Sequence, residues 1–136
     1  MTLSGPVRLL SALVSGFALA LAFPAYDLPI LGWLSVAALM LASLGARPRQ
    51  AALCGFLYGA AFYFTTVPWI YTVMRVHGHL DPPAALGVLS AMVAILSLFT
   101  AAFASGIAFL GRRSTSLACS AAPFLWVALE LGRTHM

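Results

Sequence analysis

Charged side chains are scarce in this chain. Of its 136 residues, 7% are charged and 62% are hydrophobic, whereas a soluble domain usually carries about 25% charged residues. Because this small number of charged residues cannot build a water-facing surface, most of the molecule must be surrounded by lipid. In lipid every backbone polar group needs an internal partner, which leaves helices or closed barrels. The apolar runs are long and continuous rather than alternating, so they predict an all-α, polytopic membrane helix bundle.

Lysine is absent, and the only acidic residues are Asp27, Asp81 and Glu130. A lysine-dependent mechanism is therefore impossible within these residues, and general acid–base catalysis has almost no side chains to use. The chain also lacks Ser-x-x-Lys, Gly-x-Ser-x-Gly and phosphate-binding glycine motifs. We therefore expect no catalytic residue and no cofactor in this chain.

Cysteine is also rare, because Cys54 and Cys119 are the only two. Both lie in apolar runs without metal-site spacing, so we expect two small buried residues and no disulfide framework. The residues of the segment His77-Gly78-His79-Leu80-Asp81 include types that bind zinc or iron. Their spacing is not diagnostic, however, and a polar loop with a glycine hinge is the preferred interpretation. We expect no metal site.

Five apolar runs are present, separated by short polar or proline-containing segments. A helix needs about 20 apolar residues to cross a bilayer. The first run alone resembles a signal peptide, but the runs that follow it favour a first span. Pro24 with the Tyr26-Asp27 turn should end the first run, and Pro68 should kink the third. One transmembrane domain is expected over residues 1–136, with spans at about 9–23, 28–46, 51–74, 84–111 and 117–131.

The seven basic residues, all arginine, predict the orientation. With five alternating spans, Arg75 and Arg133 fall on one side and the other five arginines on the opposite side. The positive-inside rule assigns the arginine-rich side to the cytoplasm, so the N-terminus should lie inside and the chain should end outside. Because the arginines are scattered singly or in pairs, they suit topology and anionic headgroups better than nucleic acid, which we exclude as a partner.

Aromatic and ionisable residues gather at the predicted outer ends of the spans. Trp69 and Tyr71 suit either an interfacial aromatic belt or a wall for a lipid or lipopeptide that enters from the bilayer. Glu130 and Arg133 stand three residues apart, so they share a helix face and can pair. Such a pair at the end of an apolar span is either a simple interfacial ion pair or part of a functional site.

Several short motifs occur in a defined order along the chain. They are Gly16-Phe17, Leu21-Ala22-Phe23-Pro24, Tyr26-Asp27, Gly55-Phe56-Leu57-Tyr58-Gly59, Trp69-Ile70-Tyr71, Val76-His77-Gly78, and the run from Ala121-Ala122-Pro123 through Trp126 to Glu130 with Arg133. This series resembles the N-terminal membrane region of the bacterial apolipoprotein N-acyltransferases. Family members often have a second glycine where His79 stands, and here Gly132 separates Leu131 from Arg133. The glycine pair in the third run is also spaced for close helix packing.

The resemblance implies a function for the complete enzyme. It would move an acyl chain from phospholipid to the N-terminal cysteine of an apolipoprotein through a thioester in the inner membrane. The family carries its Glu-Lys-Cys triad in a periplasmic nitrilase-like domain, which we expect to be absent from 1–136. This chain alone is therefore expected to be inactive, and neither of its cysteines is the nucleophile. By this resemblance the rim of the lipid site comprises Trp69, Tyr71, Gly78, His79, Glu130 and Arg133.

The alternative function is a stand-alone, non-catalytic membrane module that binds lipid or a partner. A coding sequence that continues past Met136 into a Glu-Lys-Cys domain would favour the enzyme, and a stop codon would favour the module. A small transporter is a third hypothesis. It is weakened by the shortage of polar residues in the spans, because transport paths usually need them.

Overall fold

The computed structural model describes residues 4–23 and 28–135, so the Pro24 and Tyr26-Asp27 turn lies outside the described residues. Over these ranges the chain is helical and contains no strand, which confirms the prediction of an all-α fold. The helices are α1 (Gly5–Leu21), α2 (Ile30–Ser43), α3 (Pro48–Thr66), α4 (Trp69–Val76), α5 (Pro82–Gly111) and α6 (Thr115–Thr134).

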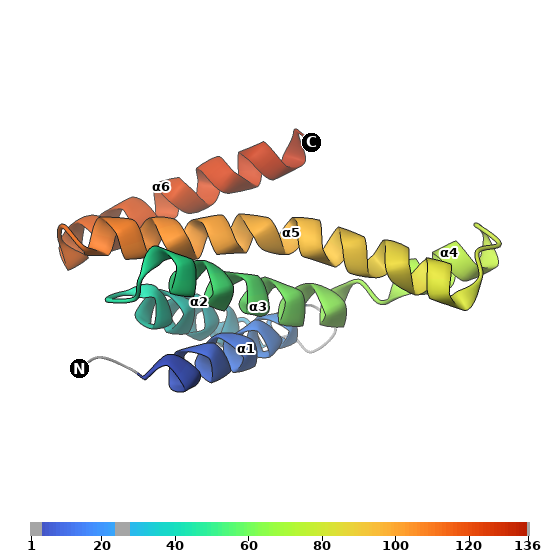
Figure 1. Cartoon of the computed structure of the whole chain (residues 1–136), viewed down its shortest axis with the longest axis horizontal. Helices are drawn as coiled ribbons and strands as arrows, with labels where there is room; N and C mark the ends of the chain where they lie inside the picture. Colours follow the sequence, from blue (N-terminus) through green and yellow to red (C-terminus); the bar gives the residue numbers. More distant parts are fainter. Residues whose placement is uncertain (1–3, 24–27, 136) are drawn as a thin grey trace.

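Helix α5 is the central element of the bundle (Figure 1). Helices α1, α2 and α3 lie on one side of it, and α6 lies on the other. Helix α4 runs beside the first part of α5, beyond the end of α3. Among the described helices, α3 contacts α1, α2 and α5, whereas α6 contacts α5 alone. One flank of α6 is therefore separated from the rest of the bundle.

Three glycines allow α3 to pack closely against its neighbours. A Cβ atom on Gly55 would collide with the backbone oxygen of Thr100 in α5, and one on Gly59 would collide with the Thr100 hydroxyl. A Cβ on Gly16 of α1 would likewise meet the backbone oxygen of Tyr58. Small residues let membrane helices approach to backbone contact. The packing role predicted for the Gly55 and Gly59 pair is confirmed.

A buried polar bridge joins α1, α2 and α3. The Ser35 hydroxyl donates a hydrogen bond to the backbone oxygen of Ser15 at 2.6 Å and lies 2.8 Å from the Tyr58 hydroxyl. All three residues are buried. An unpaired hydroxyl in an apolar interior is costly, so this bridge favours one relative placement of the three helices.

One end of the bundle gathers the start of α1 and the connections α2–α3 and α5–α6 (Figure 1). Arg8 is 4% exposed, and its Nη1 donates to the backbone oxygens of Ala42 at 2.6 Å and Leu44 at 2.9 Å. Gly45 turns the chain with a φ of 70°, a conformation that favours glycine. The arginines at this end are Arg8, Arg47, Arg49, Arg112 and Arg113, the five that alternation of spans assigns to one side.

The third expected run is two helices rather than one. Helices α3 and α4 are bent by 57° at the break between them. Proline restricts the residue before it to non-helical conformations, and Val67 has φ −117° and ψ 29°. The break that Pro68 predicts is therefore present.

Helices α5 and α6 are long and apolar enough to cross a membrane, and the bent pair α3 and α4 is a third candidate. Helices α1 and α2 are apolar but shorter, at 17 and 14 residues. Lengths and composition thus support two or three spans among the described residues, and five only if the two short helices also cross.

Candidate functional site

The six residues expected at a lipid site fall into two groups. Glu130 and Arg133 lie near the end of α6, level with Leu96 of α5. Trp69 and Tyr71 lie on α4, and Gly78 and His79 lie in the turn that follows it. Tyr71 is level with Leu86 of α5. Leu86 and Leu96 are ten residues, or about 15 Å, apart along α5. Tyr71 thus lines a different pocket from Glu130 and Arg133, so the structure does not bring all six residues together.

The first group lies in an open groove of about 460 Å³ between α6 and the pair α1 and α3. We call it the outer groove, because the arginine pattern predicts that this end of the bundle faces outward. It exists because α6 packs on α5 and leaves a gap towards the other helices. Its lining residues are mostly apolar or aromatic: Leu19, Phe23, Phe62, Tyr63, Thr66, Val67, Leu96, Thr100, Trp126, Glu130 and Arg133.

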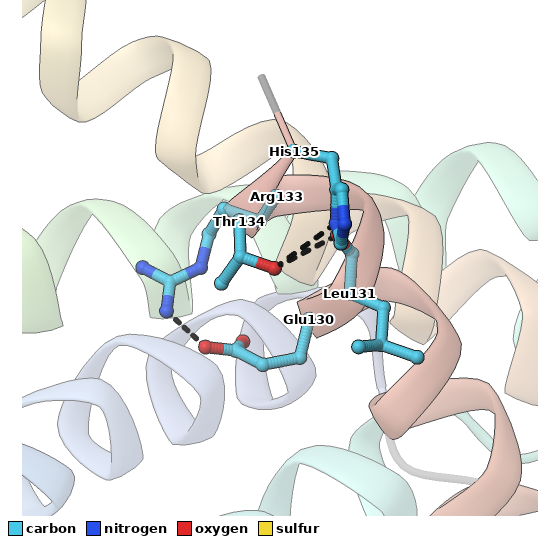
Figure 2. Close-up of polar contacts among 5 residues, drawn as sticks. All are labelled: Glu130, Leu131, Arg133, Thr134 and His135. Atoms are coloured by element: carbon cyan, nitrogen blue, oxygen red, sulfur yellow. Dashed lines mark hydrogen bonds and ion pairs between the residues drawn. The ribbon is translucent and has the colours of Figure 1, made fainter.

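Glu130 and Arg133 form the ion pair that their spacing predicts. Nη2 of Arg133 donates to Oε1 of Glu130, and Figure 2 shows the two side chains meeting on one face of α6. His135 is hydrogen-bonded separately, with its Nδ1 2.8 Å from the backbone oxygen of Leu131. Nε of Arg133 is buried and has no hydrogen-bond partner within the described part of the chain. The pair thus retains one donor without an acceptor in a largely apolar groove.

Aromatic rings build the groove walls. The ring centroids of Phe23 and Phe62 lie 5.3 Å apart, which links the end of α1 to α3. On the other side, Trp126 packs edge-on against Phe103 of α5 at 5.1 Å. Trp126 also lines a small cavity of about 30 Å³ that continues from the groove between α5 and α6. Rigid rings of this kind shape a groove with little conformational freedom to lose when a ligand binds.

The second group belongs to a projecting segment, which we call the outer arm: α4, the turn at 77–81 and the first turns of α5 (Figure 1). It has its own apolar recess of about 480 Å³, lined by Phe64, Pro68, Tyr71, Pro82, Pro83, Leu86 and Leu89. Trp69 is 59% exposed and lies outside that lining. A large exposed ring at this place suits an interfacial position.

The backbone of the turn in the outer arm restricts which amino acids fit at positions 78 and 79. A Cβ on Gly78 would approach the backbone oxygen of Met74 and the side chain of Leu80, so the tight turn requires glycine. His79 has a φ of 51°, in the left-handed region. Glycine adopts this conformation without strain, so His79 occupies a backbone position that favours glycine. Arg75 closes the turn by donating from Nη1 to the backbone oxygen of Leu80 at 3.0 Å.

The cysteines and histidines form no site of their own in the part of the chain that is described. No group of three or more His, Cys, Asp or Glu side chains there is placed to hold a metal ion. Cys54 is buried, as expected, but Cys119 is exposed, so that expectation was wrong. Cys119 lines an apolar gap between α2 and α6, whose backbones do not approach each other closely.

The sequence did not predict that Tyr63, Thr66 and Thr100 line the outer groove together with Glu130 and Arg133. Tyr63 and Thr66 lie at the end of α3, three residues apart, so their side chains share one face of the helix. That clustering of polar side chains at the end of an apolar run was the available signal. Thr100 carried no such signal, because its position depends on how α3 packs on α5.

Comparison with known proteins decides the family. The family model described as the apolipoprotein N-acyltransferase N-terminal domain matches residues 15–136. The chain belongs to this family. The resemblance seen in its motifs is therefore confirmed, and the described helices are those of the family's N-terminal domain, which is a membrane domain by the composition of its helices.

Similar proteins with the name apolipoprotein N-acyltransferase include those of three bacteria. The protein of Geobacter metallireducens is 38% identical over 130 residues, 93% of this chain. Those of Coxiella burnetii and Vibrio parahaemolyticus are 30% and 31% identical over 88% and 90% of it. The chain spans about a quarter of their lengths, 24% of the first and 25% of the other two.

Proposed function

We propose that this chain is the membrane part of an enzyme that transfers an acyl chain from a phospholipid to the N-terminal cysteine of an apolipoprotein. The observation that carries the proposal is the family match over residues 15–136. In this reaction a catalytic thiolate attacks the phospholipid ester, the lysophospholipid leaves, and a thioester remains. The amino group of the lipoprotein cysteine then attacks the thioester to form an amide and regenerate the thiol.

The membrane domain presents lipid to this chemistry rather than performing it. The chain contains no lysine, and Cys54 is buried among helices. A nitrilase-like domain of the longer enzyme would supply the nucleophile and its base. The outer groove and the recess of the outer arm are both lined mainly by apolar side chains, as acyl-chain binding requires.

We place the domain in the bacterial inner membrane with five spans, the N-terminus in the cytoplasm and the outer groove on the periplasmic side. The five arginines at one end support this orientation. Trp69 and Tyr71 would lie at the interface, Gly78 and His79 would shape the turn above it, and Glu130 and Arg133 would lie in the outer groove. Together they form the two parts of the rim through which phospholipid and apolipoprotein approach.

A non-catalytic lipid-binding module is the second candidate. The observation in its favour is that the outer groove is shaped by this chain's own helices and needs no catalytic group. Such a module would bind lipid without changing any lipoprotein, so a chemical readout separates the two functions.

The test is complementation by the complete coding sequence that contains this chain, in a strain depleted of its own N-acyltransferase. We expect restored growth and N-acylated lipoproteins detected by mass spectrometry. Trp69→Ala and Arg133→Ala should each lower acylation, whereas Phe124→Ala, at a residue 78% exposed on α6, should not. A membrane-inserted product that yields no N-acylated lipoprotein would contradict the enzyme and favour the module.

A further inference from the structure

The connections α2–α3 and α5–α6 carry one positively charged surface at the end of the bundle opposite the outer arm (Figure 1). The connections are neighbours, because a Cβ on Gly111 at the end of α5 would lie 2.8 Å from the Leu44 side chain. Two exposed arginines lie at each connection. We call these four residues the arginine surface: Arg47, Arg49, Arg112 and Arg113. Arg8 at the same end is buried and instead bonds the last carbonyls of α2.

No carboxylate of the described chain lies near enough to neutralise the arginine surface. Asp81 precedes α5, whose 30 residues place it about 45 Å from Arg112. Glu130 lies about 22 Å further along α6 than Thr115 and is already paired with Arg133. Exposed charges interact weakly beyond the Debye length of about 8 Å. The described residues therefore leave four positive charges at this end without a carboxylate partner.

The helices themselves do not explain positive charge at this place. Arg47 is the N-cap of α3, and Arg49 lies in the first turn of that helix, where the helix dipole disfavours cations. The positive-inside rule explains which side of a membrane carries arginines, but it does not say what neutralises them in the folded bundle. Like charges on neighbouring connections repel each other, so an external anion would stabilise this end of the molecule.

Neighbouring apolar residues indicate that the anion is a lipid. Leu53 lies one helical turn after Arg49 and is 48% exposed. Phe109 lies three residues before Arg112 and is 56% exposed. In a membrane such apolar side chains contact hydrocarbon, while arginines extend to the headgroup layer. An anionic phospholipid fits both, since its phosphodiester accepts paired hydrogen bonds from a guanidinium, whereas a soluble anion gains nothing from the apolar side chains.

We infer that the arginine surface binds the headgroups of anionic phospholipids, such as phosphatidylglycerol, in the leaflet that surrounds this end of the bundle. The bound phosphates reduce the repulsion between the two connections and so stabilise their contact. The inference goes beyond the proposed function, because the arginine surface lies at the opposite end of the bundle from the outer arm and needs no acyl transfer.

A lipid competition on the complete protein tests the inference. The protein is purified in a neutral detergent and offered equal amounts of phosphatidylglycerol and phosphatidylethanolamine with the same acyl chains. Native mass spectrometry then counts the lipids that remain bound. We expect phosphatidylglycerol to be retained preferentially, since the ammonium group of phosphatidylethanolamine is repelled by the arginines. Equal retention of the two lipids would overturn the inference.

Two exposed arginines at opposite ends of the molecule give a matched pair of variants. Arg112→Gln removes one charge from the arginine surface, whereas Arg75→Gln removes one charge from the outer arm. Arg112→Gln should lower the ratio of retained phosphatidylglycerol to phosphatidylethanolamine about fivefold, which corresponds to roughly 1 kcal/mol for an arginine near an anionic membrane surface. Arg75→Gln should leave the ratio unchanged. An equal fall in both variants would assign the preference to net charge and refute a localised surface.

Two further measurements test the chemistry of the arginine surface. Arg112→Lys keeps the positive charge and should retain most of the preference for phosphatidylglycerol. A loss as large as that of Arg112→Gln would contradict electrostatic binding of headgroups. Inorganic phosphate in excess over the lipid, at constant ionic strength, should not displace phosphatidylglycerol. Displacement by phosphate would show a site for a free anion and refute the lipid surface.

Discussion

At the scale of single residues, the fold depends on a few positions where backbones nearly touch. Gly55 is the strictest of them, because a Cβ there would meet the backbone of Thr100 and Ala101 and the side chain of Ala104. Backbone atoms in the middle of a helix cannot move aside without shifting the whole helix. Gly87 of α5 is the contrasting case, since nothing lies within 4 Å of a Cβ added there.

We therefore predict that Gly55→Ala lowers the free energy of unfolding by about 1–3 kcal/mol, the usual cost of overpacking. Gly87→Ala should be neutral or stabilising by up to about 1 kcal/mol, because alanine favours helix. Unfolding by a denaturing detergent titration, followed by circular dichroism, measures both. Equal stability of the two variants would contradict close α3–α5 packing.

Residue spacing predicted the contacts within single helices of the site but not the contacts between helices. The Glu130–Arg133 pair follows from a separation of three on a helix, and the close-packing glycines follow from a separation of four. The unpaired Arg133 Nε and the neighbouring Tyr63 could not be predicted, because α3 and α6 meet only across a groove. The exposure of Cys119 likewise depends on α6 having a single neighbour.

At the scale of elements, Pro68 decides where α3 ends and α4 begins. The position of the break could be predicted, since proline offers no N–H and restricts Val67. The 57° angle of the bend could not, because spacing along the sequence does not show how α4 packs beside α5. The bend places Tyr71 against Leu86 and Leu89 in the recess of the outer arm.

Replacing Pro68 by alanine should let α3 continue into α4 and straighten the pair. We expect α4 to leave α5, which would lengthen or broaden the distance between spin labels at Thr72 and Ala91, measured by pulsed electron resonance in a variant without native cysteines. Pro123→Ala is the matched control, since α6 already runs continuously through its proline. A distance unchanged by Pro68→Ala would show that α5 contacts, not proline, fix the bend.

At the scale of the whole molecule, helix α5 explains why the expected site residues separate. Its 30 residues extend about 45 Å, more than the roughly 30 Å of bilayer hydrocarbon. Helices α1 and α2 cover only part of that length, so the outer arm extends past the main bundle (Figure 1). The apolar runs predicted the order of the helices but five of them instead of six, because the third run is divided at Pro68. Only the packing reveals that the two groups lie beside different parts of α5.

The proposed orientation is the claim on which both lipid sites depend, and impermeant thiol labelling tests it most directly. In a background with Cys54→Ala and Cys119→Ala, one cysteine is placed at exposed Ser114, in the α5–α6 turn, or at exposed His77, in the outer arm. We predict that in intact spheroplasts only the His77→Cys protein is labelled, and that Ser114→Cys reacts after the membrane is permeabilised. Labelling of Ser114→Cys from outside, with His77→Cys protected, would contradict the orientation and place both lipid sites on the wrong side for lipoprotein acylation.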